Sequence, residues 1–247
     1  MKEDHRRLLR RIIPPRLRRL YRRYVSPIVR DQHYGEYRTR RDFFSRAFAL
    51  LAFNGIDGDY AEFGCCGGMT FGLAHRMSRR FGMRCRLWAF DSFAGLPAPQ
   101  GPEDEHPLWV EGTMAIGEEE FHAICREHRI PCDEYAVIPG YYADTLAPGS
   151  GRALPENICL AYVDCDLYSS ARSVLAFLGP RLKHGMIIAF DDYFCWSSSQ
   201  VSGERRACGE FFRDSPQWRL LPFQAYGGGM AFVVERSDLV GPAGACF

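Results

Sequence analysis

The chain has almost no lysine, because only Lys2 and Lys183 among its 31 basic residues are not arginine. It also lacks any run of about 18 uninterrupted apolar residues, so the sequence contains no candidate membrane-spanning helix. Arginines near the start are not followed by the apolar stretch of a secretory signal. No internal repeat is visible. These absences lead us to expect a cytoplasmic protein.

What is present is typical of a soluble α/β domain with a sizeable core: 247 residues, 47% of them hydrophobic and 25% charged. The ten cysteines do not follow the spacing of a disulfide framework. Cys85, Cys159 and Cys165 fall in or beside expected core strands. We therefore interpret the cysteines as reduced thiols that pack as small apolar side chains.

Charge is distributed unevenly along the chain. Residues 1–30 hold eleven Lys or Arg against two acids, a net +9, and the remainder holds 20 basic and 28 acidic residues, a net −8. Arginines alternate there with apolar residues, which is compatible with short amphipathic helices on an anionic inner membrane surface. The alternative is an arm that packs on an acidic face of its own or a partner subunit. The segment contains no recognisable nucleic-acid-binding module, so no nucleic acid partner is expected.

Residues 1–36 are predicted to be this basic N-terminal arm, and residues 37–247 a single catalytic domain. Periodicity predicts helices at 37–53, 69–82, 116–130, 171–185 and 204–212. Short apolar runs predict strands at 59–64, 86–90, 135–140, 158–164, 186–192, 218–223 and 229–235. This order predicts a doubly wound, mostly parallel, seven-stranded Rossmann-like sheet that ends in an antiparallel hairpin. The stretch from Pro97 to Trp109 is expected to be a long, functional loop.

Acidic residues follow two of the most apolar strands. ICLAYVDCD ends in Asp164 and Asp166, and MIIAFDDY carries Asp191 and Asp192. Ligands bind at the carboxyl ends of the strands in an open α/β sheet, and converging carboxylates repel one another unless a cation or proton lies between them. Mg²⁺, which prefers oxygen ligands, meets that need.

A glycine-rich turn follows the first predicted strand. EFGCCGG places Gly64, Gly67 and Gly68 where a cofactor can approach the backbone, and Asp91 at the end of the second strand can bind ribose hydroxyls. Such turns serve NAD and S-adenosylmethionine alike. The Gly-x-x-Gly-Gly pattern and the closing antiparallel hairpin favour S-adenosylmethionine.

Five segments occur in a familiar order: EFGCCGG, LWAFDSFAGLP, ADTL, VDCDLYSSA and IIAFDDY. Together they resemble the macrocin O-methyltransferase family, class I enzymes that methylate sugar hydroxyls in antibiotics, over about residues 58–193. The resemblance implies a homo-oligomer in which Asp164, Asp191 and Asp192 bind Mg²⁺. It also implies that His106 and Asp164 are catalytic, with His106 as the proton acceptor. It places S-adenosylmethionine against Glu62, Phe63, Gly64, Cys65, Cys66, Asp91 and Ser92, to which the glycine pattern adds Gly67.

The acceptor is expected to be a saccharide with neighbouring hydroxyls, on a small molecule or, if the arm binds membrane, on a glycolipid. Trp109 is predicted to contact it, and Tyr168, Tyr193 and Trp196 wall its pocket or pack in the core. Asp166 is interpreted as a supporting acid or a helix N-cap rather than a metal ligand. Two alternatives remain open: an NAD-dependent oxidoreductase, and a non-catalytic scaffold that retains the fold.

Overall fold

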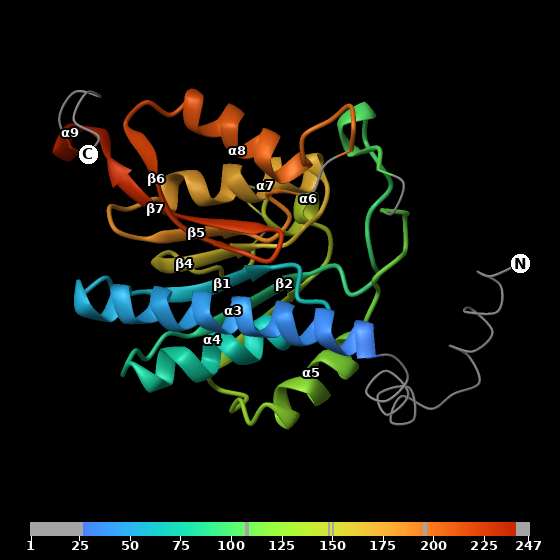
Figure 1. Cartoon of the computed structure of the whole chain (residues 1–247), viewed down its shortest axis with the longest axis horizontal. Helices are drawn as coiled ribbons and strands as arrows, with labels where there is room; N and C mark the ends of the chain where they lie inside the picture. Colours follow the sequence, from blue (N-terminus) through green and yellow to red (C-terminus); the bar gives the residue numbers. More distant parts are fainter. Residues whose placement is uncertain (1–26, 107–108, 148, 150, 195–196, 241–247) are drawn as a thin grey trace, which may run out of the picture.

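A computed structural model describes residues 27–106, 109–147, 149, 151–194 and 197–240. Most of the basic arm, residues 1–26, therefore lies outside the described residues. The rest forms three layers, with a seven-stranded sheet between two layers of helices (Figure 1). This confirms the predicted α/β fold. The strands are β1 (Asp59–Phe63), β2 (Leu87–Asp91), β3 (Tyr135–Pro139), β4 (Ile158–Val163), β5 (Ile187–Phe190), β6 (Trp218–Tyr226) and β7 (Gly229–Arg236).

The sheet has the order β3-β2-β1-β4-β5-β7-β6. Strands β1 to β5 pair in parallel, and β7 pairs antiparallel with both β5 and β6. Every residue of β4 is buried, as expected for a central strand covered on both faces. The strand order reverses between β1 and β4, so a ligand-binding crevice is expected at their carboxyl ends.

One face of the sheet is covered by α3 (Pro27–Phe53), α4 (Met69–Arg80) and α5 (Glu118–Glu127) (Figure 1). Helix α3 buries an aromatic and aliphatic stripe at helical spacing, which includes Phe43, Phe44 and Phe48. The Phe43 ring stacks on Tyr226 with centroids 4.5 Å apart, and Phe44 stacks on Tyr162 at 5.3 Å. These contacts fix α3 across the middle of the sheet.

The opposite face is covered by α6 (Tyr142–Thr145), α7 (Tyr168–Leu178) and α8 (Gly203–Arg213) (Figure 1). Two 3₁₀ turns, η1 (Pro102–Asp104) and η2 (Gly179–Arg181), and a last short helix α9 (Ser237–Val240) complete the described elements. Ala171, Val174, Leu175 and Leu178 of α7 point into the core beneath β4 and β5. Among all the residues that the structure describes, no helix has the length and apolar character needed to cross a membrane.

Helix α3 is longer than predicted. It begins at Pro27 rather than residue 37, so the predicted boundary between arm and domain at residue 36 falls inside a continuous helix. The missed residues carry no apolar stripe, and Gly35 and Glu36 are exposed. This part of the helix therefore had no periodic signal to detect.

Candidate active site

A cavity of about 340 Å³ lies at the carboxyl ends of the central strands. Its wall contains residues from the turns that follow β1, β2, β3, β4 and β5, together with the first turn of α7 and the loop after β2. Among the predicted site residues, those lining the cavity are Gly64, Cys66, Asp91, Ser92, Trp109, Asp164, Asp166 and Asp192. The topology thus gathers side chains from both predicted subsites in one place.

The turn after β1 depends on Gly64. Its φ of 94° lies in the left-handed region, and a Cβ at this position would lie 1.7 Å from the Asp164 carbonyl oxygen. The Gly64 N–H donates to Phe90 O, and the Asp164 N–H donates to Phe63 O, so the turn is tied to β2 and β4. Glycine is therefore required for β1 and β4 to lie side by side at the cavity floor.

Asp91 connects the first two turns. Its Oδ2 accepts the Cys65 N–H at 2.7 Å and its Oδ1 accepts the Phe93 N–H at 2.8 Å. Each carboxylate oxygen keeps a further lone pair, and Asp91 lines the cavity, so it can still accept hydrogen bonds from ribose hydroxyls. The neighbouring Ser92 hydroxyl donates to Gly95 O and accepts the Ala94 N–H.

Glu62 lies behind the turn and does not line the cavity. It is fully buried, and its carboxylate accepts hydrogen bonds from the hydroxyls of Tyr60 and Thr70. Burial raises the pKa of Glu62 to about 8 against the lowering effect of these hydrogen bonds. Phe63 and Cys65 are also buried beneath the turn. The predicted cofactor contacts of these three residues remain predictions, while Gly64, Cys66, Asp91 and Ser92 do face the cavity.

Three carboxylates form the acidic end of the cavity: Asp164, Asp166 and Asp192. Burial, and then the charges of Asp191 and Asp192, raise the pKa of Asp164 well above its usual range. Burial and the Asp192 carboxylate raise the pKa of Asp166 to about 8. Burial is the largest cause of both shifts, and a cation or a proton between the carboxylates would relieve the repulsion that adds to it.

Asp166 does not cap a helix, contrary to one of its two predicted roles. The residue at the N-cap of α7 is Leu167, and no side chain caps the helix from that position. Asp166 instead has a φ of 60°, an uncommon left-handed conformation for a residue other than glycine. Asp166 lies in the loop after β4 and lines the cavity.

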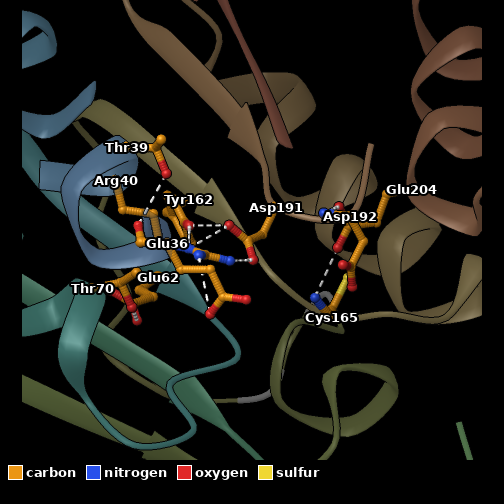
Figure 2. Close-up of polar contacts among 10 residues, drawn as sticks. All are labelled: Glu36, Thr39, Arg40, Glu62, Thr70, Tyr162, Cys165, Asp191, Asp192 and Glu204. Carbon is orange, nitrogen blue, oxygen red and sulfur yellow. Dashed lines mark hydrogen bonds and ion pairs between the residues drawn. The ribbon is translucent and has the colours of Figure 1, made fainter. Parts of the chain in front are cut away.

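Asp191 and Asp192 are turned to opposite sides (Figure 2). Asp191 accepts two hydrogen bonds from the Arg40 guanidinium, at 3.0 and 2.5 Å, and one from the Tyr162 hydroxyl. Asp191 is absent from the cavity wall, whereas Asp192 is part of it. The predicted ligand set is therefore divided, with Asp164 and Asp192 facing the cavity and Asp191 paired with a cation from α3.

The loop after β2 is fastened to α7 by Asp104, which is 2% exposed. Its carboxylate accepts the Gln100 N–H and the Ser169 N–H, both at 2.9 Å. Within this loop the His106 ring stacks on Trp109 with centroids 4.0 Å apart. Trp109 lines the cavity and His106 does not, so His106 as a proton acceptor remains a prediction.

Among the other predicted acceptor contacts, Tyr193 packs on Phe190 and Phe232 in the core. Tyr168 lines a second cavity, which shares Gln100, Ser169 and Ser173 with the first. Trp196 lies outside the described residues. Sequence reasoning did not identify Arg40, Asp104 or Glu204, because each reaches the site from a distant segment and none belongs to a local motif.

The donor set suits a hard divalent cation in its chemistry. Three carboxylates, Asp164, Asp166 and Asp192, lie at the acidic end of the cavity, Asp91 lines it at the first two turns, and no Lys, Arg or His among the described residues lines it. Within the described ranges, however, no three His, Cys, Asp or Glu side chains are already gathered as a ligand cluster. Asp164 and Asp192, with Asp166 beside them, are the residues that could hold the ion from the cavity wall.

Comparisons with known proteins identify the family of the chain. The family model described as Macrocin-O-methyltransferase (TylF) matches residues 33–214. An 8-demethyl-8-(2,3-dimethoxy-alpha-L-rhamnosyl)-tetracenomycin-C 4'-O-methyltransferase from Streptomyces olivaceus is 30% identical over 148 residues, 57% of this chain and 54% of the relative. Demethyldecarbamoylnovobiocin O-methyltransferase from Streptomyces niveus is 27% identical over 161 residues, 62% of this chain and 60% of the relative. The chain thus spans less than two thirds of the length of these relatives.

Solved structures share the fold. The O-methyltransferase NovP superposes with a TM-score of 0.66 at 22% identity, over 80% of each chain. The calicheamicin methyltransferase CalS11 superposes with a TM-score of 0.61 at 18% identity, over 78% of this chain and 77% of that one. Because the family model covers most of the chain, from α3 through α8, this protein belongs to the macrocin O-methyltransferase family.

Proposed function

We propose that this protein transfers a methyl group from S-adenosylmethionine to a hydroxyl of a sugar carried by a glycosylated small molecule, with Mg²⁺ bound at the acidic end of the cavity. The observation that carries the proposal is the shared cavity. Its wall contains Gly64 and Asp91 from the first two turns together with Asp164 and Asp192 from the central strands. A methyl donor and an acceptor hydroxyl bound there would lie next to each other.

The turns after β1 and β2 support the donor's place. Gly64 and Cys66 line the cavity, and so does Asp91, whose carboxylate is already oriented by two main-chain N–H groups. Membership of the family favours S-adenosylmethionine over the NAD that a similar turn could bind. Methyl transfer is an in-line displacement, so the chain's main contribution is to hold acceptor oxygen, methyl carbon and sulfur in line.

Asp164 and Asp192 are the proposed holders of Mg²⁺. When bound, the ion would act as a Lewis acid that stabilises a developing alkoxide and orients the acceptor. The raised pKa of Asp164, whose causes include the nearby Asp192 carboxylate, supports a cation in this place. The chain's own acids would also accept hydrogen bonds from neighbouring hydroxyls of a sugar ring, and His106 is proposed to take the proton.

The acceptor class is inferred from the cavity wall and from the relatives. Leu96, Trp109, Tyr141 and Tyr142 give the cavity wall an apolar and aromatic part in addition to the acids. This combination suits a sugar ring, whose C–H faces pack on aromatic side chains. The two Streptomyces relatives are named for a rhamnosyl-tetracenomycin and for demethyldecarbamoylnovobiocin. A glycosylated small molecule is therefore the proposed acceptor.

The direct test is a methyl-transfer assay with S-adenosylmethionine against a panel of glycosides, nucleotide-activated sugars and glycolipids, with Mg²⁺ and with EDTA. We expect transfer to a glycoside that EDTA abolishes and Mg²⁺ restores. S-adenosylhomocysteine should also raise the unfolding midpoint by binding the native state, whereas NAD should not. A midpoint raised by NAD alone would replace this proposal with the oxidoreductase alternative.

The variant Asp164→Asn tests the proposed roles of the two subsites separately, because it removes a charge at the acid cluster while leaving the first turn unchanged. It should lose methyl transfer and keep the calorimetric affinity for S-adenosylhomocysteine within about twofold, since donor binding and acceptor activation use different residues. If both properties disappear together in a folded protein, the acid cluster and the donor site are not separate, and the assignment is wrong.

A further inference from the structure

A buried carboxylate, Glu204, lies directly behind the acidic end of the cavity. It is the second residue of α8 and is fully buried. One carboxylate oxygen accepts the Cys165 N–H at 3.0 Å and the other accepts the Asp192 N–H at 3.0 Å (Figure 2). The Glu204 carboxylate thus connects the loop after β4 to the loop after β5, and both of its hydrogen bonds are to main-chain N–H groups.

Both contacts are adjacent to proposed site residues. Cys165 lies between Asp164 and Asp166, and Asp192 is itself part of the cavity wall. Between β4 and β5 the ladder of hydrogen bonds ends where the Asp191 N–H donates to Val163 O. Beyond that bond, the Glu204 carboxylate connects the segment after β4 to the segment after β5.

The backbone around Glu204 is arranged to bring it there. A Cβ on the preceding Gly203 would lie 2.5 Å from the Tyr168 nitrogen, so only glycine allows α8 to start against the beginning of α7. The Ser202 hydroxyl accepts the Arg205 N–H and donates to Tyr193 O, which fixes this helix start to the segment after β5. The close approach of two helix starts therefore places one carboxylate between two loops.

General stability does not explain a carboxylate in this position. Among the described residues no basic side chain forms an ion pair with Glu204, and both loops that it contacts carry acids, Asp164 and Asp166 on one and Asp192 on the other. Burying an acid among acids costs free energy, and an apolar side chain would fill the same space without that cost. What an apolar side chain cannot do is accept two N–H groups at once.

We propose that Glu204 is a positioning residue of the active site, whose carboxylate holds the loops after β4 and β5 at the separation that directs Asp164 and Asp192 into the cavity. The inference rests on the proposed function for its consequence in methyl transfer. The clamp itself is a property of the two loops that can be measured without any substrate.

Glu204→Gln is the informative variant, because glutamine has nearly the same shape but only one accepting oxygen. With the full-length protein, we expect Mn²⁺, used as a paramagnetic probe for Mg²⁺, to bind at least about tenfold more weakly, as for other residues that orient metal-binding groups. The kcat for methyl transfer should fall, while the affinity for S-adenosylhomocysteine stays unchanged. The unfolding midpoint should change little, since glutamine fills the same space and only one hydrogen bond is lost.

Amide hydrogen exchange gives a readout independent of activity. In the native protein the N–H groups of Cys165 and Asp192 should both be protected, and in Glu204→Gln one of them should exchange faster. Gly203→Ala keeps the carboxylate but moves the start of α8, so it should weaken Mn²⁺ binding in the same way. Glu210→Gln changes an acid of the same helix that bonds Tyr168 and Arg206 and should leave Mn²⁺ binding unaltered.

A lower unfolding midpoint with unchanged Mn²⁺ affinity and unchanged kcat in Glu204→Gln would overturn the proposal and leave Glu204 a purely stabilising residue. Equal weakening in Glu210→Gln would overturn it too. A wild-type protein that transfers no methyl group and does not bind S-adenosylhomocysteine refutes the proposed function instead, and the exchange of the two amides then still decides whether Glu204 holds the loops.

Discussion

Arg40 of α3 and Asp191 at the end of β5 form a two-pronged ion pair beneath the sheet's carboxyl edge, with side chains 14% and 8% exposed (Figure 2). Asp191 raises the pKa of Arg40 above its usual range, although burial acts to lower it. The two residues lie 151 positions apart, so the pair fixes the first described helix to the last parallel strand. Helix α3 is therefore part of the site's support.

Removal of the Arg40 charge should be costly. Arg40→Met leaves the buried Asp191 carboxylate without its cation, and we expect the free energy of unfolding to fall by ~3 kcal/mol. Asp191→Asn alone should also destabilise, but the double variant should recover part of the sum, because neither charge is then left unpaired. Urea unfolding of the four proteins measures this coupling. Strictly additive losses would mean that the pair contributes nothing as a pair.

The same variants test whether Asp191 binds a metal, as its position in the sequence predicts. If Asp191 exchanges Arg40 for Mg²⁺, then Mg²⁺ should raise the unfolding midpoint of Arg40→Met more than that of the wild type. The structure leads us to expect equal increases, because Asp164 and Asp192 face the cavity and Asp191 does not. A larger increase in the variant would restore Asp191 to the ligand set.

Glu62 should make the protein less stable as pH rises. The ordinary pKa of 4.5 applies in the unfolded chain, while burial raises the native pKa to about 8. Between these values the native state retains a proton that the unfolded state has released, so the free energy of unfolding falls with increasing pH. Asp191 and Asp91 add to the shift, and the hydroxyls of Thr70 and Tyr60 oppose it.

Glu62→Gln removes this titration and keeps a side chain that can bond both hydroxyls. Relative to the wild type, the variant should gain stability progressively from pH 5 to pH 8. Urea unfolding at several pH values in that range measures the difference. A stability difference that is the same at every pH would show that Glu62 has the same pKa in both states.

The strands and the longer helices that cover them could be predicted because they carry strong local patterns, whereas the one-turn helix α6 was not predicted. β4 and β5 are continuous apolar runs, and α4 has its apolar residues on one face. The cavity residues Asp91, Asp164 and Asp192 were found for a related reason, since each lies at the carboxyl end of a predicted strand. In a parallel sheet, strand ends meet at one edge whatever the details of packing.

The supporting residues could not be found in this way. Glu204 lies in the first turn of a helix, where an acid is ordinarily explained by the helix dipole. Asp104 is one acid in a polar loop, and Arg40 one arginine in an arginine-rich helix. What distinguishes all three is burial against segments far away in the sequence. Local patterns contain no information on such contacts. They also do not show in which direction the side chains of Asp191 and Asp192 turn.

Asp104 should hold the loop after β2 closed over the cavity. Asp104→Ala removes the acceptor of both the Gln100 and Ser169 N–H groups. We expect a loss of about 1 kcal/mol, typical of a lost helix cap, and a higher KM for the acceptor with donor affinity retained. Limited proteolysis should cut between residues 97 and 109 faster in the variant. The exposed neighbour Glu105 provides the control, because the protease should cut Glu105→Ala at the wild-type rate.

Two glycines of the first turn should respond very differently to the same substitution. In Gly64→Ala the new Cβ would lie 1.7 Å from the Asp164 carbonyl oxygen, so β1 and β4 must separate where they meet the cavity. We expect a loss of more than about 4 kcal/mol, or no folded protein. Gly67 also has a positive φ, 77°, but no atom lies within 4 Å of its added Cβ. Gly67→Ala should therefore cost only about 1 kcal/mol of backbone strain.

The Gly67→Ala protein then tests the donor site, since it remains folded. If the backbone of this turn approaches S-adenosylmethionine, a methyl group at Gly67 occupies space that the donor needs, and calorimetry should show weaker binding of S-adenosylhomocysteine. Methyl transfer should show a raised KM for the donor with kcat nearly unchanged, because the acid cluster is not altered. Unchanged donor affinity would place the donor away from Gly67 and restrict the cofactor site to Gly64, Cys66 and Asp91.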